Sequence, residues 1–167
     1  MRDRNSNQMT VEHLRNLFSY DQETGVFTRL RSKGTQKAGS VAGGFDKDGY
    51  VRIRIDGKFY KAHRVAWFYV NGVWPKNEID HINGIPSDNR ISNLREATRL
   101  ENCQNRSINV DNKSGYRGVH WHKQCSKWAA HIRHQGKKIY LGLFETAQEA
   151  GFAAEAARQK LFTHHRI

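Results

Sequence analysis

The sequence predicts an α+β fold assembled from small modules, and three of its segments carry that prediction. Residues 50–62, "YVRIRIDGKFYKA", alternate apolar and polar side chains around an Asp–Gly pair, which is typical of a tight β-hairpin. Residues 116–161 contain three strand-like runs and then a helical pattern that begins with a capping box of Thr146 and Glu149. Residues 78–105 read as strand, loop, strand and helix start. We therefore expect a hairpin and helix region, a central ββα segment, and a three-stranded antiparallel sheet packed on one helix.

The composition indicates a nucleic-acid-binding protein. Hydrophobic residues make up 37% of the 167 residues, and the mean hydropathy is −0.83, which suits small modules better than one large core. Lys and Arg number 28 against 16 Asp and Glu, so the formal charge is +12. Such a charge predicts a polyanionic partner, first nucleic acid and second an anionic membrane surface. No long apolar run can span or anchor in a membrane, and the first residues lack the apolar core of a secretory signal, so we expect a cytoplasmic protein.

The cysteines and the distribution of charge limit which kind of metal or nucleic-acid site the chain can hold. Cys103 and Cys125 are far apart and form no C-x-x-C pair, which excludes a cysteine-rich zinc site. Net charge is +5 over residues 1–62, +1 over residues 63–106 and +6 over residues 107–167. Basic flanks can grip phosphates, while the nearly neutral centre can hold a cation.

The N-terminal third is expected to hold short elements around the hairpin. A helix begins after Thr10, a plausible N-cap, with Leu14, Leu17 and Phe18 at helical spacing, and a strand follows over residues 24–30. Residues 31–44 are basic and glycine-rich and read as a mobile loop, either touching phosphates or simply solvated. A buried helix over residues 62–72 closes at Gly72. In the hairpin, Val51, Ile53 and Ile55 make an apolar face, and Arg52 and Arg54 make a basic face that we expect to bind DNA.

The central segment offers a set of side chains suited to phosphodiester hydrolysis. Asp80 ends the first strand, and Asn102 falls in the first turn of a helix that Thr98 and Glu101 cap. If the helix start folds back beside the strand, the oxygen atoms of Asp80 and Asn102 can converge on Mg²⁺ or Mn²⁺. His81 points to the opposite strand face and can activate a water as a general base. The amide of Asn93 can hydrogen-bond backbone groups and fix the loop.

These residues also resemble a known family. The pattern Asp–His at 80–81, "DNRISNLREAT" at 88–98 and "ENCQN" at 101–105 resembles HNH homing endonucleases of phages and prophages, with the ββα-metal fold. "YDQETGVFT", "GYVRIRIDGKFYKAHRVAW" and "GVWPKNEIDHING" agree with it. The resemblance implies that His81 is the general base, that Asp80 and Asn102 bind one divalent ion, and that Asn93 is the central structural Asn. Asn102 stands where many members have a second His, and an amide oxygen is a weaker ligand.

The C-terminal segment resembles the APETALA/ethylene-response-factor type of DNA-binding domain. It contains that family's three blocks, "YRGV" at 116–119, "KWAAHIR" at 127–133 and "LGLFETAQEA" at 141–150. The resemblance implies a sheet laid in the DNA major groove. His120 and His122 replace arginines and Tyr140 replaces a tryptophan, which predicts looser base readout. Trp128, Ile132 and Phe144 are expected core residues. The implied DNA contacts are Arg117, His120, His122, His131, Arg133, Lys138 and Tyr140.

Two further polar residues of the centre, Arg99 and His63, have two interpretations each. Arg99 can contact the scissile phosphate or be a solvated arginine. His63, just before the buried helix, can reach the site or simply pack and cap. Asn83, Asp88 and Asn89 are interpreted as loop formers.

The predicted boundaries and function follow from these patterns. We expect an N-terminal region over 1–62, an HNH nuclease core over 63–106, a linker over 107–114 and an APETALA-type domain over 115–167. The predicted activity is hydrolysis of double-stranded DNA with one Mg²⁺ or Mn²⁺ per site, nicking one strand, by a monomer or a homodimer on DNA. The expected setting is a phage- or prophage-encoded protein in the bacterial host. The alternatives are a DNA-binding regulator with a weak or inactive site, and a nuclease acting on RNA or structured nucleic acid.

Overall fold

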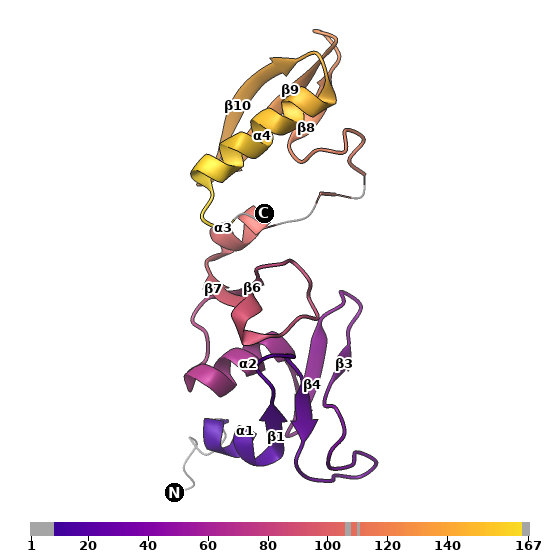
Figure 1. Cartoon of the computed structure of the whole chain (residues 1–167), viewed down its shortest axis with the longest axis vertical. Helices are drawn as coiled ribbons and strands as arrows, with labels where there is room; N and C mark the ends of the chain where they lie inside the picture. The colour runs from indigo at the N-terminus through magenta and orange to yellow at the C-terminus, as the bar shows by residue number, and fades with distance from the viewer. Residues whose placement is uncertain (1–8, 106–107, 110, 165–167) are drawn as a thin grey trace, which may run out of the picture. The chain divides into compact units, whose positions relative to one another are not determined.

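The chain divides into two compact units, Met1–Glu96 and Ala97–Ile167, each described here by itself. The structure is a computed structural model that describes residues 9–105, 108–109 and 111–164. Helices and small sheets are mixed in it, as the sequence predicted for an α+β fold (Figure 1). Residues 107 and 110 of the predicted linker lie outside the described residues. None of the described helices has the length and apolar character needed to cross a membrane.

The first unit begins with a short helix and ends with the strands of the central segment. Thr10 caps the first helix by accepting a hydrogen bond from the backbone N–H of His13 at 3.1 Å. Phe18, expected in this helix, instead begins a strand, in register with Arg29. The elements are α1 (Val11–Leu17), β1 (Phe18–Tyr20), β2 (Phe27–Arg29), β3 (Gly44–Phe45), β4 (Val51–Ile55), β5 (Lys58–Lys61), α2 (Ala62–Asn71), β6 (Glu78–His81), the 3-10 helix η1 (Ile91–Asn93) and β7 (Leu94–Ala97).

The predicted hairpin and the helix after it are confirmed. Asp56 and Gly57 both have positive φ, 47° and 84°, and connect β4 to β5 with Ile55 opposite Lys58. Positive φ at both central residues is what a two-residue turn matching the strand twist requires. β3 adds to the other edge of β4. Gly72, with φ of 76°, ends α2 in the left-handed conformation.

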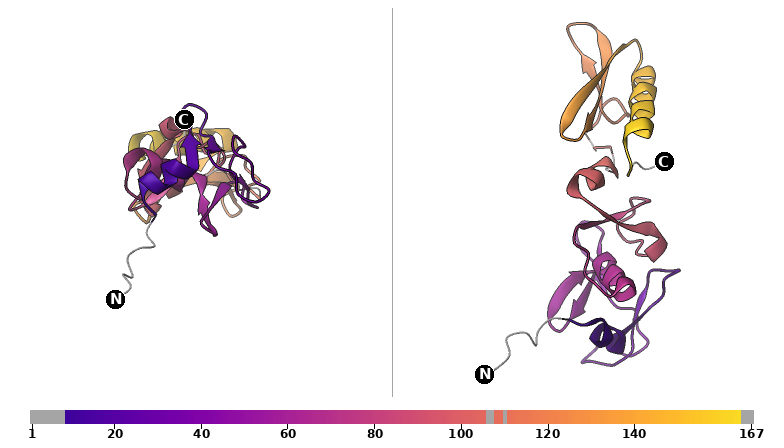
Figure 2. Two further views of the ribbon diagram at one scale, coloured as in Figure 1. Left: turned by 90° about the horizontal axis from the view of Figure 1, so that it is seen from below. Right: turned by 90° about the vertical axis from the view of Figure 1, so that its left-hand side faces the viewer.

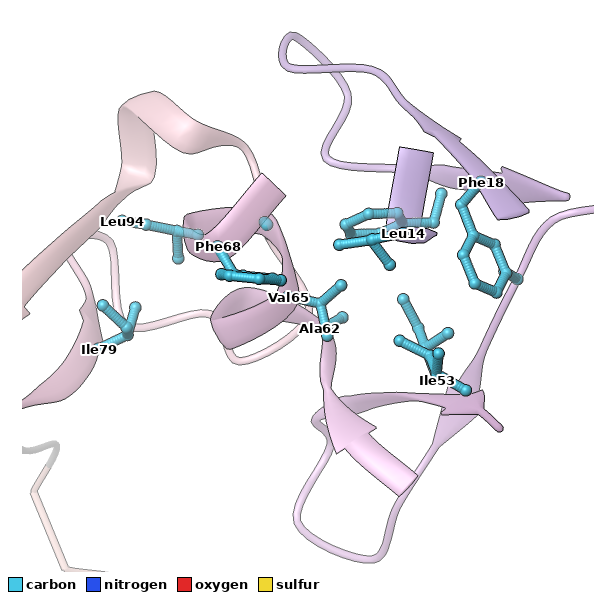
Figure 3. Close-up of a cluster of buried hydrophobic side chains, with 12 residues drawn as sticks. Leu14, Phe18, Ile53, Ala62, Val65, Phe68, Ile79 and Leu94 are labelled. Carbon is cyan, nitrogen blue, oxygen red and sulfur yellow. The ribbon is translucent and has the colours of Figure 1, made fainter. Parts of the chain in front are cut away.

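One hydrophobic cluster holds the first unit together (Figure 3). Leu14 of α1, Ile53 of β4 and Val65 of α2 are fully buried in it. Ile79 of β6 and Leu94 of β7 extend the cluster beneath the central segment. The cluster therefore contains residues from both sides of the expected boundary between residues 62 and 63. It packs against both α1 and β6, the strand that carries His81.

The segment over residues 31–44 has more local order than the expected mobile loop. Lys33 and Gln36 exchange backbone hydrogen bonds of 2.9 and 3.1 Å. The N–H of Arg29 donates to the carbonyl of Ser40 at 2.9 Å, and Val41 bridges to Thr28. The contacts of Ser40 and Val41 tie the C-terminal part of the segment to β2, and the Lys33–Gln36 bonds order its middle.

The second unit is a three-stranded antiparallel sheet with one long helix on it. The strand order is β10-β9-β8, and α4 lies along one face of the sheet (Figure 2). Both predicted capping boxes are present, at Thr98 with Glu101 and at Thr146 with Glu149. The elements are α3 (Arg99–Asn102), η2 (Cys103–Asn105), β8 (Val119–His122), β9 (Lys127–His134), β10 (Lys137–Phe144) and α4 (Ala147–Leu161).

Small residues bring α4 close to the rest of its unit. Ala150 and Ala154 are fully buried and pack with Val119, Ala130 and Ile132. A Cβ atom at Gly151 would overlap the ring of Tyr116, so this helix position tolerates only hydrogen. Trp128 and Phe144 are partly buried against the same cluster, as predicted.

Candidate functional site

The end of β6 carries the two central residues of the site. Asp80 and His81 are each only 5% exposed. The N–H of Ile82 donates to the carbonyl of Asn93 at 2.9 Å, and the N–H of Gly84 donates to the carbonyl of His81 at 2.8 Å. The backbone at His81 and directly after it is therefore fixed where the strand turns into the loop.

Asn93 lies at the end of the loop that follows His81, and its side chain hydrogen-bonds to residues earlier in that loop. Its Oδ1 accepts the backbone N–H of Asn83 at 3.0 Å. Its Nδ2 donates to Asn83 Oδ1 at 3.0 Å and to the carbonyl of Asp88 at 2.9 Å. Because Asn93 is 7% exposed, these bonds are made away from bulk water. This is the geometry that a loop-fixing role requires, and the role itself stays a prediction.

Asn89 reaches His81 although the sequence indicated only a loop former. It is 3% exposed, and its Oδ1 lies 3.5 Å from His81 Nε2. Its Nδ2 donates to the carbonyl of Ser87 at 3.0 Å, which identifies Oδ1 as the atom facing His81. No spacing rule singles Asn89 out from the other asparagines of this polar loop, so sequence reasoning missed it.

Burial sets the protonation of His81. It lowers the pKa of the imidazole below its ordinary value, while the Asn89 hydrogen bond and the carboxylates of Asp80 and Asp88 oppose that shift. A lowered pKa keeps the ring neutral at pH 7, and a neutral imidazole can accept a proton.

Two further rings lie against His81. The ring of His63, on α2, is 4.9 Å from the ring of His81, centroid to centroid, at an interplanar angle of 87°. Tyr50, just before β4, lies 5.4 Å from His63 and 5.9 Å from His81. Burial lowers the pKa of His63 to about 3, with smaller effects of His81 and of nearby cations. Of the two interpretations of His63, the structure thus favours a place at the site.

Asp80 is paired with a cation of its own chain. Arg95, on β7 beside β6, donates from Nε at 2.9 Å and approaches from Nη2 at 2.8 Å, both to Asp80 Oδ2. Sequence reasoning gave Arg95 no role, since pairing between neighbouring strands depends on a register that the sequence does not show.

A divalent ion fits this position chemically. Within the described residues, no group of three or more His, Cys, Asp and Glu side chains could hold a metal. Mg²⁺, however, is often held by one or two carboxylates together with substrate phosphates. The buried carboxylate of Asp80 meets that requirement, and an ion there would share it with Arg95 or displace the arginine.

Asn102 and Arg99 belong to the second unit. Both lie on α3, whose last residue is Asn102, and the N–H of Asn102 donates to the carbonyl of Thr98 at 2.9 Å. The predicted convergence of Asn102 with Asp80 joins residues of different units and stays a prediction.

The predicted basic face of the hairpin is exposed and carries an aromatic ring. Arg52 and Arg54 point outward from β4, and their guanidinium carbons lie 5.1 and 5.8 Å from the ring centroid of Phe59, which is 62% exposed. Arg54 also lines a pocket of about 520 Å³. Three more basic residues line the same pocket, namely Arg29, Arg31 and Lys33.

The strand register divides the C-terminal sheet into two faces. Ala130 and Ile132 of β9 pack against α4, so His131 and Arg133, which alternate with them, lie on the opposite face. Directly opposite residues share a face, and the pairs are Tyr140 with His131, Lys138 with Arg133, His120 with Ala129 and His122 with Lys127. Six of the seven expected DNA contacts thus lie on the face away from α4: His120, His122, His131, Arg133, Lys138 and Tyr140.

Arg117, the seventh, has partners inside its own unit. Its Nη1 and Nη2 donate to the carbonyls of Gln104 and Cys103, each at 2.8 Å. These bonds tie the chain before β8 to η2, which gives the guanidinium a structural task that the motif did not indicate.

Comparison with known proteins gives a family for the first part of the chain. A model of HNH endonucleases matches residues 60–104. Protein 3.8 of Escherichia phage T7 is 38% identical over 85 residues, which cover 48% of this chain and 70% of that protein. The solved structure "DNA binding and cleavage by the HNH homing endonuclease I-HmuI" is similar with a TM-score of 0.42 and 22% identity, over 86% of this chain and 76% of that chain.

A separate similarity is to plant proteins. AP2-like ethylene-responsive transcription factor TOE2 of Arabidopsis thaliana is 43% identical over 47 residues, 28% of this chain and 10% of the relative. APETALA2-like protein 2 of Oryza sativa has the same identity over the same length and 11% coverage of the relative. The chain therefore spans only about a tenth of these plant relatives.

Proposed function

Because this chain belongs to the HNH endonuclease family, we propose that it is a metal-dependent endonuclease that cuts double-stranded DNA. The observation that best supports the proposal is the state of His81. Its imidazole is buried, lies at a fixed strand end, has a lowered pKa and neighbours the Asp80 carboxylate. Those are the properties of a general base beside a ligand for a hard cation.

His81 acts by taking a proton from the attacking water. Asn89 Oδ1 can only accept a hydrogen bond, so Nε2 of His81 carries the ring hydrogen toward it and Nδ1 is the atom that accepts the proton. The water oxygen bonds to phosphorus while the bond from phosphorus to the 3′-oxygen breaks. The leaving oxygen takes a proton from solvent, and the products carry 5′-phosphate and 3′-hydroxyl ends.

Asp80 and Asn102 are the residues proposed to hold one Mg²⁺ or Mn²⁺. When bound, the ion neutralises charge on the phosphate and on the leaving oxygen. Asn93 contributes by keeping the loop after His81 closed through its three hydrogen bonds. One such site cuts one strand, so a monomer nicks DNA, and a double-strand break needs two copies.

The two basic surfaces are proposed to hold the duplex. The first is the exposed face of β4 with Arg52 and Arg54, and the second is the face of the β8–β10 sheet away from α4. The similarity to APETALA-type proteins supports the second surface. Arg133 and Lys138 supply charge there, while Tyr140, 59% exposed, offers a ring. The similarity to a phage protein supports a phage- or prophage-encoded enzyme acting in a bacterial cell.

The proposal is tested with supercoiled plasmid DNA. With Mg²⁺ or Mn²⁺ we expect conversion to the nicked circle, and a chelator should abolish it because the phosphate charge is then not neutralised. Single-stranded RNA of the same sequence, incubated in parallel, should stay intact. Intact plasmid under all metal conditions would reject the nuclease, and preferential RNA cleavage would establish the rival substrate.

A second candidate function has one observation in its favour. Since Arg95 already neutralises Asp80 with two contacts, the chain can be a DNA-binding regulator whose site takes no metal. Tight duplex binding with no metal-dependent nicking would establish that function instead.

A further inference from the structure

Three rings from three separate elements meet at the general base. Tyr50 comes from the turn before β4, His63 from α2 and His81 from β6. The centroid distances of 4.9, 5.4 and 5.9 Å are all within the range of favourable ring pairs. The contact between His63 and His81 is edge-to-face, which restricts how far either ring can rotate. Hereafter Tyr50 and His63 are called the ring clamp.

His63 contributes its ring rather than a hydrogen bond. It is 7% exposed, and its buried Nδ1 has no hydrogen-bond partner among the described residues. A buried nitrogen without a partner gives no advantage to folding. What the side chain gives its surroundings is therefore a flat, rigid surface against His81, and phenylalanine can supply the same surface.

Tyr50 is held in place by contacts of Asp46 and Lys61. Asp46 Oδ1 accepts the N–H groups of Asp48 and Tyr50 at 3.0 and 3.1 Å, which closes the turn that carries the ring. Asp46 Oδ2 accepts a bond from Lys61 Nζ at 2.5 Å. The same Nζ lies 4.1 Å from the centroid of the Tyr50 ring, a cation–π contact. The clamp is thus braced by the ion pair of Lys61 with Asp46.

His81 also has a hydrogen bond to Asn89, which is long. At 3.5 Å this bond constrains the imidazole weakly, while a proton acceptor must be held close to its productive orientation. We infer that the ring clamp of His63 and Tyr50 positions the His81 imidazole, with both acting as positioning residues that do not touch the substrate. The inference rests on the proposed function of His81 as the general base.

The first test compares two replacements of His63 that differ in shape. His63→Phe keeps a flat ring, while His63→Leu fills a similar volume without one. We expect His63→Leu to lower the single-turnover nicking rate at saturating DNA about 10- to 100-fold with unchanged affinity for DNA, and His63→Phe to recover most of that rate. Tyr50→Leu and Tyr50→Phe should follow the same order.

A matched control separates positioning from general loosening of the core. Val65→Ala removes buried volume from the same helix without removing a clamp ring, and it should lower the unfolding temperature but leave the nicking rate near that of the wild type. Equal loss of rate in His63→Phe and His63→Leu would overturn the inference, because a nitrogen would then be the working group. An unchanged rate in His63→Leu would overturn it as well.

The second readout needs no nuclease activity. In the wild type, ¹⁵N-edited NMR of the ring nitrogens should show His81 as one neutral tautomer protonated at Nε2. In His63→Leu it should show mixed tautomers, and in His63→Phe the wild-type pattern. A wild-type His81 spectrum in His63→Leu overturns the clamp whether or not the chain cuts DNA, whereas absent nicking with the expected spectra counts only against the proposed function.

Discussion

At the scale of single residues, Asp80 is paired with Arg95 and is also the proposed ligand of a divalent ion, so the two cations would compete for one carboxylate. Arg95 approaches Asp80 Oδ2 at 2.8 and 2.9 Å, and the two side chains are 23% and 6% exposed. Any divalent ion bound by Asp80 has to coexist with that arginine. A structure in which the carboxylate is already neutralised is stable without metal, which suits an enzyme that takes its ion together with DNA.

Arg95→Met should make the stability of the protein depend on Mg²⁺. Without the arginine, Asp80 is a buried charge with its main partner removed, and we expect the free energy of unfolding to fall by up to about 3 kcal/mol. Mg²⁺ at a hundred times its Kd should restore about 2.7 kcal/mol. Chemical denaturation with and without Mg²⁺ measures both effects.

The double variant Arg95→Met with Asp80→Asn is the control, since it removes the buried charge and the ligand together. It should unfold at the same denaturant concentration with and without Mg²⁺. If it gains as much from Mg²⁺ as Arg95→Met does, the ion binds elsewhere and Asp80 is not its ligand.

His63 should make the folded state sensitive to mild acid. Its pKa is about 3 in the folded protein because of burial and of the nearby His81, Lys61 and Arg64, with Asp46 opposing, while an unfolded histidine titrates near 6.5. The unfolded chain therefore binds this proton first. Stability is fully present above about pH 6.5 and falls by about 1.4 kcal/mol per pH unit for this group as the pH drops toward 3.

Denaturation midpoints measured between pH 8 and pH 4.5 check this titration. His63→Phe should show a slope smaller by one proton, with the remaining slope from other groups such as His81. Identical slopes in the variant and the wild type would mean that His63 is not buried in its neutral form.

At the scale of elements, Gly118 shows how closely the strands of the second unit approach. Its φ is 79°, and a Cβ there would overlap the carbonyl oxygen of His131 on β9. Gly118→Ala should therefore cost more than about 2 kcal/mol of stability, because backbone has to move as well as adopt a strained φ.

Gly115→Ala is a matched control for that prediction. Gly115 has a φ of 72° but open space around its Cβ position, so only the conformational cost of about 1 kcal/mol applies. Thermal unfolding of both variants gives the difference. Equal losses would show that the close approach to His131 does not exist in solution.

Elements governed by neighbouring residues could be predicted from the sequence. The alternation around Asp56–Gly57 gave the hairpin, and the Thr–Glu spacings gave the starts of α3 and α4, because each depends on residues within a few positions. Phe18 was misassigned to the helix because pairing with Arg29 competes with helical periodicity there.

Contacts of the site between elements far apart in the chain could not be predicted from the sequence. The Asp–His pair and Asn93 stood out by their spacing, but the partners of His81 did not. His63 reaches His81 across 18 residues through the packing of α2, and Arg95 reaches Asp80 across 15 through strand register. In the sequence, Asn89 looks like the other asparagines of its loop. Only the fold distinguishes it, because there its side chain is buried at 3% exposure.

At the scale of the whole molecule, both units are basic. The first has 16 Lys and Arg against 11 Asp and Glu, and the second has 12 against 5. The proposed general base, His81, lies in the first unit, so the β8–β10 sheet of the second unit is free to serve binding. Losing a charge from the face of the β8–β10 sheet away from α4 should change the affinity for DNA but not the nicking rate of the bound complex.

Arg133→Ala tests this division of labour. It should weaken duplex binding and reduce the slope of log affinity against log salt by about one, with the single-turnover rate unchanged at saturating protein. Lys160→Ala removes the same charge from α4, on the other side of the sheet, and should leave both quantities near wild type. An equal effect of the two variants would mean that only net charge matters, not the face that carries it.

The proposed chemistry depends on His81 acting as the general base, and one paired measurement tests that role. Nicking of supercoiled DNA and duplex binding are followed on the same preparations of wild type and His81→Ala with Mg²⁺. We expect the variant to bind DNA as tightly as the wild type and to nick it at least 100-fold more slowly, the size of contribution expected of a positioned general base. Nicking by His81→Ala at the wild-type rate would contradict it.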